Sequence, residues 1–283
     1  MADPSSSAPP RLFDPALLHM RQARAVWLGA ENFLASRVAE DLSERLHAVM
    51  RDFKAVTDVG SPGDMLRAAL REKYPQIARI DIPADDKPLP LAPSSLDFVV
   101  SSLALQFVND LPGTLAQIKR ALKPDGLFLA AMIGGETLTE LRQSFAAAES
   151  DIEGGVSPRV VPMVDLRDAG ALLQRAGFAL PVTDVDRITV RYDNAFALMN
   201  DLRKMGATNI LNERSKKFLR RATLLRMVEI YAEKFSDNDG RIRATFDIVW
   251  LSGWSPHESQ QKPLQPGSAK ASLADAVKGA RKT

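Results

Sequence analysis

The chain has 283 residues, 45% of them hydrophobic, and a formal net charge of +2 at pH 7. This length suits one large α/β domain with additional elements. The near balance of 37 Lys and Arg with 35 Asp and Glu gives no reason to expect nucleic-acid binding. The absence of cysteine excludes a disulfide framework, a thiolate metal site and a cysteine nucleophile, and it fits a reducing, cytoplasmic compartment.

The N-terminal region is predicted to be a leader followed by helices. Residues 1–12 are rich in Ser and Pro and lack the apolar segment of a signal peptide, so we expect a disordered leader. Helical apolar spacing predicts helices over 17–25 and 31–51, so residues 13–54 are expected to form a helical cap. No apolar run reaches the ~20 residues that a membrane-spanning helix needs.

Strands alternating with helices predict a mainly parallel sheet in residues 55–254. The expected strands lie at 56–59, 77–82, 96–101, 127–132, 182–190 and 243–251, and the expected helices at 65–73, 114–122, 134–148 and 166–176. Residues 196–235 read as helical, which predicts a lid over 194–238 before the last strand. Residues 255–283 turn to Pro, Gln, Ser and Lys, which is typical of a flexible tail, and we expect its start to fold back over the pocket.

The segment from Val56 to Asp64 predicts a ligand pocket. It reads as a strand ending in a glycine turn that feeds a helix, an arrangement that directs backbone N–H groups and a positive helix end at a ligand. Leu96 follows Gly60 by 36 positions, whereas two further βα units need roughly 50 residues. The sheet is therefore expected to be short of one βα unit.

Four segments, taken in order, resemble the motifs of class I S-adenosylmethionine (SAM) dependent methyltransferases. They are 58–60 (DVG), 84–91 (ADDKPLPL), 96–102 (LDFVVSS) and 122–126 (LKPDG). Further segments at 106–112, 134–142, 153–159 and 257–263 resemble bacterial relatives of the methyltransferase-like assembly factor of mitochondrial respiratory complex I, which is an arginine hydroxylase. The malonyl-carrier-protein methyltransferase of biotin synthesis is a more distant cousin. The resemblance implies a Rossmann-like, seven-stranded methyltransferase sheet and a SAM cofactor.

The resemblance also implies the cofactor-binding residues. Glycines at the turn would allow the backbone to approach the methionine part of SAM, but Pro62 replaces the family's second glycine and removes an N–H donor. The positions that match the family's motifs are Asp58, Gly60, Ser61, Gly63, Asp85, Asp86, Ser101 and Gln106. The structural alternatives are a solvated turn for the acid pair and capping of the following turn for Ser101 and Gln106.

The ribose-binding acid is the open point of this assignment. If residues 79–82 form the second strand, Asp81 can hold the ribose hydroxyls. Asp85 instead matches the acid that contacts adenine after the third strand, and we favour that interpretation. It leaves no ribose acid, at a cost of roughly 1.5 to 3 kcal/mol per lost charged hydrogen bond.

Other chemistries have little support in the sequence. The three histidines are scattered, so no metal site is expected, and there is no Gly-x-Ser-x-Gly elbow. A basic helix over 213–221 suits an acidic protein or RNA, but such runs are usually solvated faces.

The resemblance therefore implies a SAM-dependent methyltransferase that acts on a protein or a carrier-bound acceptor. Methyl transfer depends mainly on positioning, so no catalytic residue is assigned. Two alternatives stay open: a non-catalytic assembly factor for a complex I subunit, with a closed pocket, and a protein arginine hydroxylase.

Overall fold

The computed structural model describes residues 11–84 and 87–261. Most of the expected leader and of the expected tail lies outside these residues, as do the predicted cofactor residues Asp85 and Asp86. Within the described ranges, no helix is long and apolar enough to cross a membrane.

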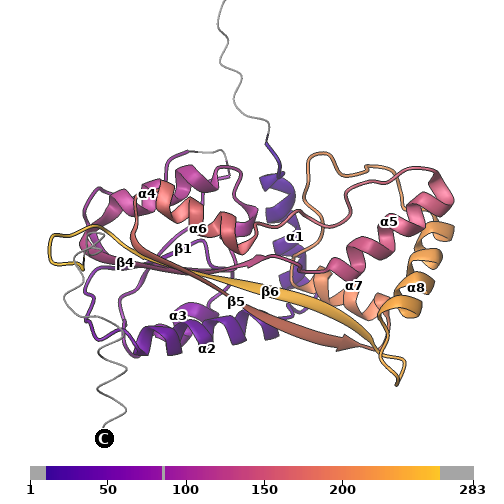
Figure 1. Cartoon of the computed structure of the whole chain (residues 1–283), viewed down its shortest axis with the longest axis horizontal. Helices are drawn as coiled ribbons and strands as arrows, with labels where there is room; N and C mark the ends of the chain where they lie inside the picture. Colours follow the sequence, from indigo (N-terminus) through magenta and orange to yellow (C-terminus); the bar gives the residue numbers. More distant parts are fainter. Residues whose placement is uncertain (1–10, 85–86, 262–283) are drawn as a thin grey trace, which may run out of the picture.

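One mixed sheet organises the molecule (Figure 1). Its order is β2-β1-β3-β4-β6-β5, in which β6 runs antiparallel to both β4 and β5 and the other pairs are parallel. The strands are β1 (Val56–Val59), β2 (Ala78–Ile80), β3 (Leu96–Ser102), β4 (Leu122–Gly134), β5 (Ala179–Tyr192) and β6 (Ile242–Trp254). This confirms the Rossmann-like α/β fold class, and the described sheet has six strands where the resemblance implies seven.

The position of β2 contradicts the interpretation that we favoured from the sequence, in which the strand before Asp85 is the third strand of the family's sheet. β2 pairs directly with β1, with Val59 opposite Ile80, which is the place of the second strand in the expected fold. The connection from β1 to β2 contains only the six-residue helix α3 (Met65–Leu70). It places β2 directly beside β1 in the sheet. Asp81 therefore follows β2 beside the glycine turn.

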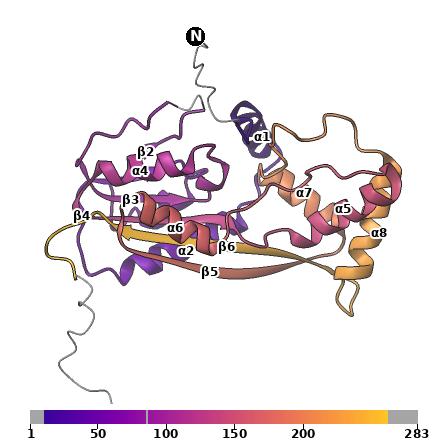
Figure 2. The same ribbon diagram turned by 45° about the horizontal axis from the view of Figure 1, so that its top comes forward.

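Helices cover both faces of the sheet (Figures 1 and 2). One face carries α2 (Phe33–His47) and α3, and the other carries the short η1 (Leu105–Phe107), α4 (Leu111–Ala121) and α6 (Leu166–Arg175). Three further helices, α5 (Thr139–Glu153), α7 (Ala195–Lys204) and α8 (Arg221–Phe235), gather at the far end of the β5–β6 ribbon. Helix α1 (Pro15–Trp27) contacts α7 and lies between this group and the parallel strands (Figure 2).

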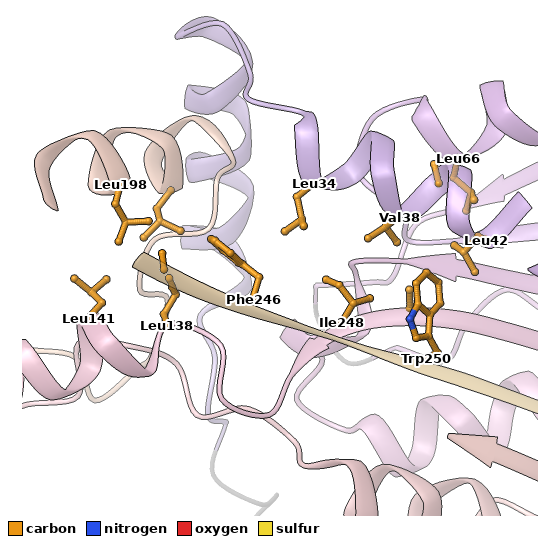
Figure 3. Close-up of a cluster of buried hydrophobic side chains, with 14 of the residues drawn as sticks. Leu34, Val38, Leu42, Leu66, Leu138, Leu141, Leu198, Phe246, Ile248 and Trp250 are labelled. Carbon is orange, nitrogen blue, oxygen red and sulfur yellow. The ribbon is translucent and has the colours of Figure 1, made fainter. Parts of the chain in front are cut away.

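Alternation along the buried strands explains these layers. Side chains of a strand point to opposite faces in turn, so Phe246, Ile248 and Trp250 of β6 join the core under α2 and α7 (Figure 3). Val249 and Leu251 join the core under α4 and α6. The apolar stripe of α2 meets the first core through Leu34, Val38, Leu42 and Leu46.

Residues 205–220 are not helical, contrary to the expected helical run over 196–235. Leu211 forms an antiparallel bridge with Phe13, and the Asn212 side chain donates to the Arg11 carbonyl at 2.6 Å. These tertiary bonds replace the helical ones. The predicted basic helix over 213–221 is therefore wrong, because α8 begins only at Arg221.

The start of the tail lies at the amino ends of the parallel strands, whereas the glycine turn lies at their carboxyl ends. Ser255 exchanges backbone hydrogen bonds with Asp125 and Gly126 at the beginning of β4. The expectation that this segment folds over the pocket is therefore wrong for residues 255–261. The antiparallel pairing carries β6 away from the carboxyl ends of the parallel strands.

Candidate functional site

The glycine turn lies where the strand order reverses. The chain leaves β1 for β2 on one side and returns to β3 on the other, and open α/β sheets bind ligands at such a point, outside the carboxyl ends of their strands. The turn after β1 and the segment after β3 meet at this edge.

Buried hydrogen bonds attach the turn to β3. The Ser102 N–H donates to Ser61 Oγ at 2.8 Å, and Ser101 Oγ donates to the Val59 carbonyl at 2.7 Å. Gly60 has a φ of +75°, and its N–H donates to the Ile80 carbonyl at 2.8 Å. The side chains of Ser61 and Ser101 are thus occupied within the fold and do not line the cavity described below.

Asp58 is likewise a buried support of the turn. Burial raises the pKa of its carboxyl group, and hydrogen bonding to Ser61 and the charge of Arg67 oppose that rise. Arg67 Nη1 lies 3.4 Å from Asp58 Oδ2, and the same guanidinium binds Asp64 at 2.6 Å. The arginine therefore connects the end of β1 to the start of α3.

A cavity of about 1180 Å³ opens over the turn, somewhat larger than most small-molecule sites. One wall comes from the sheet edge and includes Gly60, Pro62, Gly63, Asp81, Ile82, Leu103 and Gln106. The facing wall comes from α1, residues 159–163 and residues 203–209. The two walls enclose a space that reaches from the glycine turn to the helical additions.

Two side chains cover the glycines of the turn. A Cβ atom on Gly60 would lie 2.7 Å from Ile82 Cδ1, and one on Gly63 would lie 2.8 Å from Met65 Cε. Both are closer than real contacts allow, so the glycines make room for these side chains. The turn is accessible from the cavity, but Ile82 takes part of the space beside Gly60.

Asp81 places a carboxylate on the cavity wall. Its side chain is 76% exposed and binds Arg79 Nε at 2.9 Å, while Arg79 Nη1 donates to the Gly63 carbonyl at 3.1 Å. The sequence offers Asp81 as a ribose ligand only if residues 79–82 form the second strand, and that is the position that β2 takes.

Gln106 is a predicted site residue that does face the cavity. Its Nε2 donates to the Leu103 carbonyl at 2.7 Å, which leaves Oε1 buried and without a hydrogen-bond partner among the described residues. Thr208 Oγ1, on the facing wall, is in the same condition. Buried polar atoms are normally paired, so both atoms indicate that a polar ligand completes the site.

The facing wall was missed by sequence reasoning. Asn109, after η1, accepts the Phe13 N–H at 2.8 Å and donates to the Phe13 carbonyl at 3.2 Å, and Phe13 bridges to Leu211. Three segments far apart in the chain thus meet at Phe13, next to the first turn of α1, and help to hold the facing wall in place. Only the sequence Gln-Phe-Val-Asn-Asp at 106–110, noted for its resemblance, gave any signal.

The site combines a glycine turn, a carboxylate at a strand end and an unpaired amide oxygen. It can accept hydrogen bonds from hydroxyl or N–H groups of a ligand, while Leu103, Phe107 and Met163 supply apolar contacts. Among the described residues, no group of three His, Asp or Glu side chains is arranged to hold a metal ion.

Comparison with known proteins gives consistent findings. Residues 38–130 match the family described as "Methyltransferase domain". The chain is 38% identical over 266 residues to "Arginine-hydroxylase NDUFAF5, mitochondrial" of Danio rerio, in a match that covers 87% of this chain and 83% of the relative. It is 39% identical over 220 residues to the malonyl-[acyl-carrier protein] O-methyltransferase of Laribacter hongkongensis, covering 75% and 71%.

A solved structure supports the fold alone. A Bacillus halodurans protein described as a methyltransferase superimposes with a TM-score of 0.50 at 13% identity, covering 77% of this chain and 99% of that one.

Proposed function

Because the chain belongs to the methyltransferase-domain family that includes the NDUFAF5 arginine-hydroxylases and the malonyl-[acyl-carrier protein] O-methyltransferases, we propose that it transfers a methyl group from SAM. The acceptor is a protein or a carrier-bound group, and the reaction takes place in the cytoplasm. No role for nucleic acid is proposed.

The cavity is the observation that carries this proposal. It extends from the glycine turn to the wall formed by α1 and residues 203–209, so two ligands can lie in one connected space. A group-transfer reaction needs its donor and acceptor held together in one orientation.

The residues present fit SAM in part. Gly60 and Gly63 would allow close backbone approach, Asp81 would accept the ribose hydroxyls, and Gln106 Oε1 would accept a further hydrogen bond. Asp58, Ser61 and Ser101 would act by fixing the turn, while the predicted contributions of Asp85 and Asp86 stay predictions. Pro62 provides no N–H, and Ile82 narrows the space beside Gly60.

SAM would supply an activated methyl group on a sulfonium sulfur. The chain's own contribution is then to orient the acceptor and to exclude water, for which the apolar side chains of Leu103, Ala104 and Phe107 on the cavity wall are suited. No residue needs to act as a strong base if the acceptor atom already carries a lone pair.

Titration calorimetry with SAM tests the proposal directly. We expect binding with a dissociation constant in the micromolar to submillimolar range, and no heat at millimolar SAM would contradict it. Mass spectrometry of an incubated acceptor then identifies the reaction, because methylation adds the mass of one CH₂ group.

A second candidate is a non-catalytic assembly factor for a respiratory complex I subunit. The contact of Ile82 with Gly60 and the shortened β1–β3 segment favour it. If SAM fails to bind the native chain but binds an Ile82→Ala variant, the pocket is closed by that side chain and this candidate gains support.

A third candidate is arginine hydroxylation of a complex I subunit. It rests on the printed name of relatives at 35 to 44% identity. Addition of one oxygen mass to an arginine of the partner subunit, instead of one CH₂ group, would identify this activity.

A further inference from the structure

Two arginines lie side by side on the wall of the cavity away from the glycine turn. Arg21 of α1 donates to the Asn209 carbonyl, and Arg214 Nη1 donates to the Leu211 carbonyl at 2.7 Å. Both residues line the cavity. Because their carbonyl partners are two residues apart on one segment, that segment holds both groups in fixed positions.

The positive charge of this pair is only partly compensated. Asp14 Oδ2 lies 3.6 Å from Arg214, and no carboxylate of the described residues lies within ion-pair distance of Arg21. Burial, followed by the charges of Arg214 and Arg24, lowers the pKa of Arg21. Two half-buried cations thus share one carboxylate, which is an unfavourable arrangement unless an anion joins them.

Thr208 adds a hydrogen-bond donor on the segment that binds both arginines. It precedes Asn209, lines the cavity, and its Oγ1 is buried without a hydrogen-bond partner among the described residues. A hydroxyl group can donate to an anionic oxygen. This unpaired atom is an independent indication that a ligand group binds beside the arginines.

We propose that Arg21, Arg214 and Thr208 form an anion-binding subsite for a carboxylate or phosphate group on the acceptor. The planar guanidinium fork matches both groups. This inference rests on the proposed transfer to an acceptor held in the cavity, and it adds that the acceptor carries an anionic group remote from the methylated atom.

Binding of simple anions by the full-length chain tests the subsite without SAM. Inorganic phosphate and acetate are titrated by calorimetry at constant ionic strength, with chloride as the balancing salt. We expect one of them to bind at millimolar concentration. Tighter phosphate binding indicates a phosphate-bearing acceptor, and tighter acetate binding indicates a carboxylate.

Variants assign the binding to these residues. Arg214→Gln and Arg21→Gln are expected to raise the dissociation constant by roughly 10-fold, about 1.4 kcal/mol. Thr208→Val has nearly the same shape and removes only the unpaired hydroxyl, so it keeps the fold and should still weaken binding several-fold. Arg24→Gln is the matched control, since it removes the same charge from α1 at a position outside the cavity.

Two results would overturn the subsite. One is the absence of binding by either anion above chloride at tens of millimolar. The other is equal weakening by Arg24→Gln, which would show that general charge is responsible. Anion binding without SAM binding would instead reject the methyl-transfer proposal and leave the subsite intact, so the two failures can be told apart.

Discussion

Replacement of Gly60 by alanine tests the packing at the glycine turn. The residue has a φ of +75°, and a Cβ there would lie 2.7 Å from Ile82 Cδ1 and 3.1 Å from Ala104 Cβ. The left-handed backbone costs an L-residue about 1 to 2 kcal/mol, and crowding of a packed contact costs about 1 to 3 kcal/mol more. We therefore expect Gly60→Ala to lower the free energy of unfolding by about 2 to 5 kcal/mol.

Two further variants separate these costs. Gly154 has a similar φ of +69°, and a Cβ there would meet nothing within 4 Å, so Gly154→Ala should show only the backbone cost of about 1 to 2 kcal/mol. Adding Ile82→Ala to Gly60→Ala should recover about 1 to 3 kcal/mol relative to the sum of the single losses, because the crowding is removed.

Urea unfolding followed by circular dichroism measures these differences. Equal losses for Gly60→Ala and Gly154→Ala, or no coupling between positions 60 and 82, would refute the reasoning. Either result would show that Ile82 is not packed tightly against the glycine turn, and that it does not narrow the space for SAM beside Gly60.

Three further results are expected. Asp247→Asn should lower the unfolding free energy by about 1 to 2 kcal/mol at pH 7, since Arg187 binds both Asp247 oxygens and lowers the pKa of that carboxyl. The native chain should lose this contribution as pH falls below about 4, whereas the variant should not, and urea unfolding at pH 3 and pH 7 checks this. Asp81→Asn should raise the SAM dissociation constant roughly 10- to 100-fold in calorimetry. The control Asp151→Asn removes a partly exposed carboxylate of α5 that does not line the cavity, and it should leave the dissociation constant unchanged. Gln106→Leu should weaken SAM binding about 10-fold. The melting temperature should change little, because the loss of the hydrogen bond to the Leu103 carbonyl is offset by removal of the unpaired Oε1. Unaltered SAM affinity would show that Oε1 does not contact the ligand.

Strands built around a short apolar run, Phe98–Val100 in one case and Ile248–Leu251 in the other, were predictable from the sequence. The expected strand over 96–101 is β3 (Leu96–Ser102), and the expected 243–251 lies within β6 (Ile242–Trp254). The residues of both runs are buried on both faces of the sheet, so the pattern and the structure agree. The residue count after Gly60 likewise predicted a sheet with one strand fewer than the family's seven.

The features that depend on tertiary pairing were not predictable. β2 has three residues, two of them exposed, so its pattern does not say which neighbour it pairs with. Residues 205–220 were predicted to be helical although Gly206, Thr208, Asn209 and Asn212 are weak helix formers. Their partner Phe13 is distant in the chain, so no local signal reports the pairing. The facing wall of the cavity, with Arg21 and Thr208, depends on that pairing and was missed for the same reason.

The place of β6 has a consequence for how the chain is made. It is the last described strand in the sequence, yet it lies inside the sheet between β4 and β5. While the ribosome is still adding residues 242–254, the backbone groups of β4 and β5 that will pair with β6 remain unpaired. Unpaired strands of this kind can associate with other chains. We infer that the nascent polypeptide is prone to association until residues 242–254 have been made and paired, and that a holdase chaperone would protect it most during that interval.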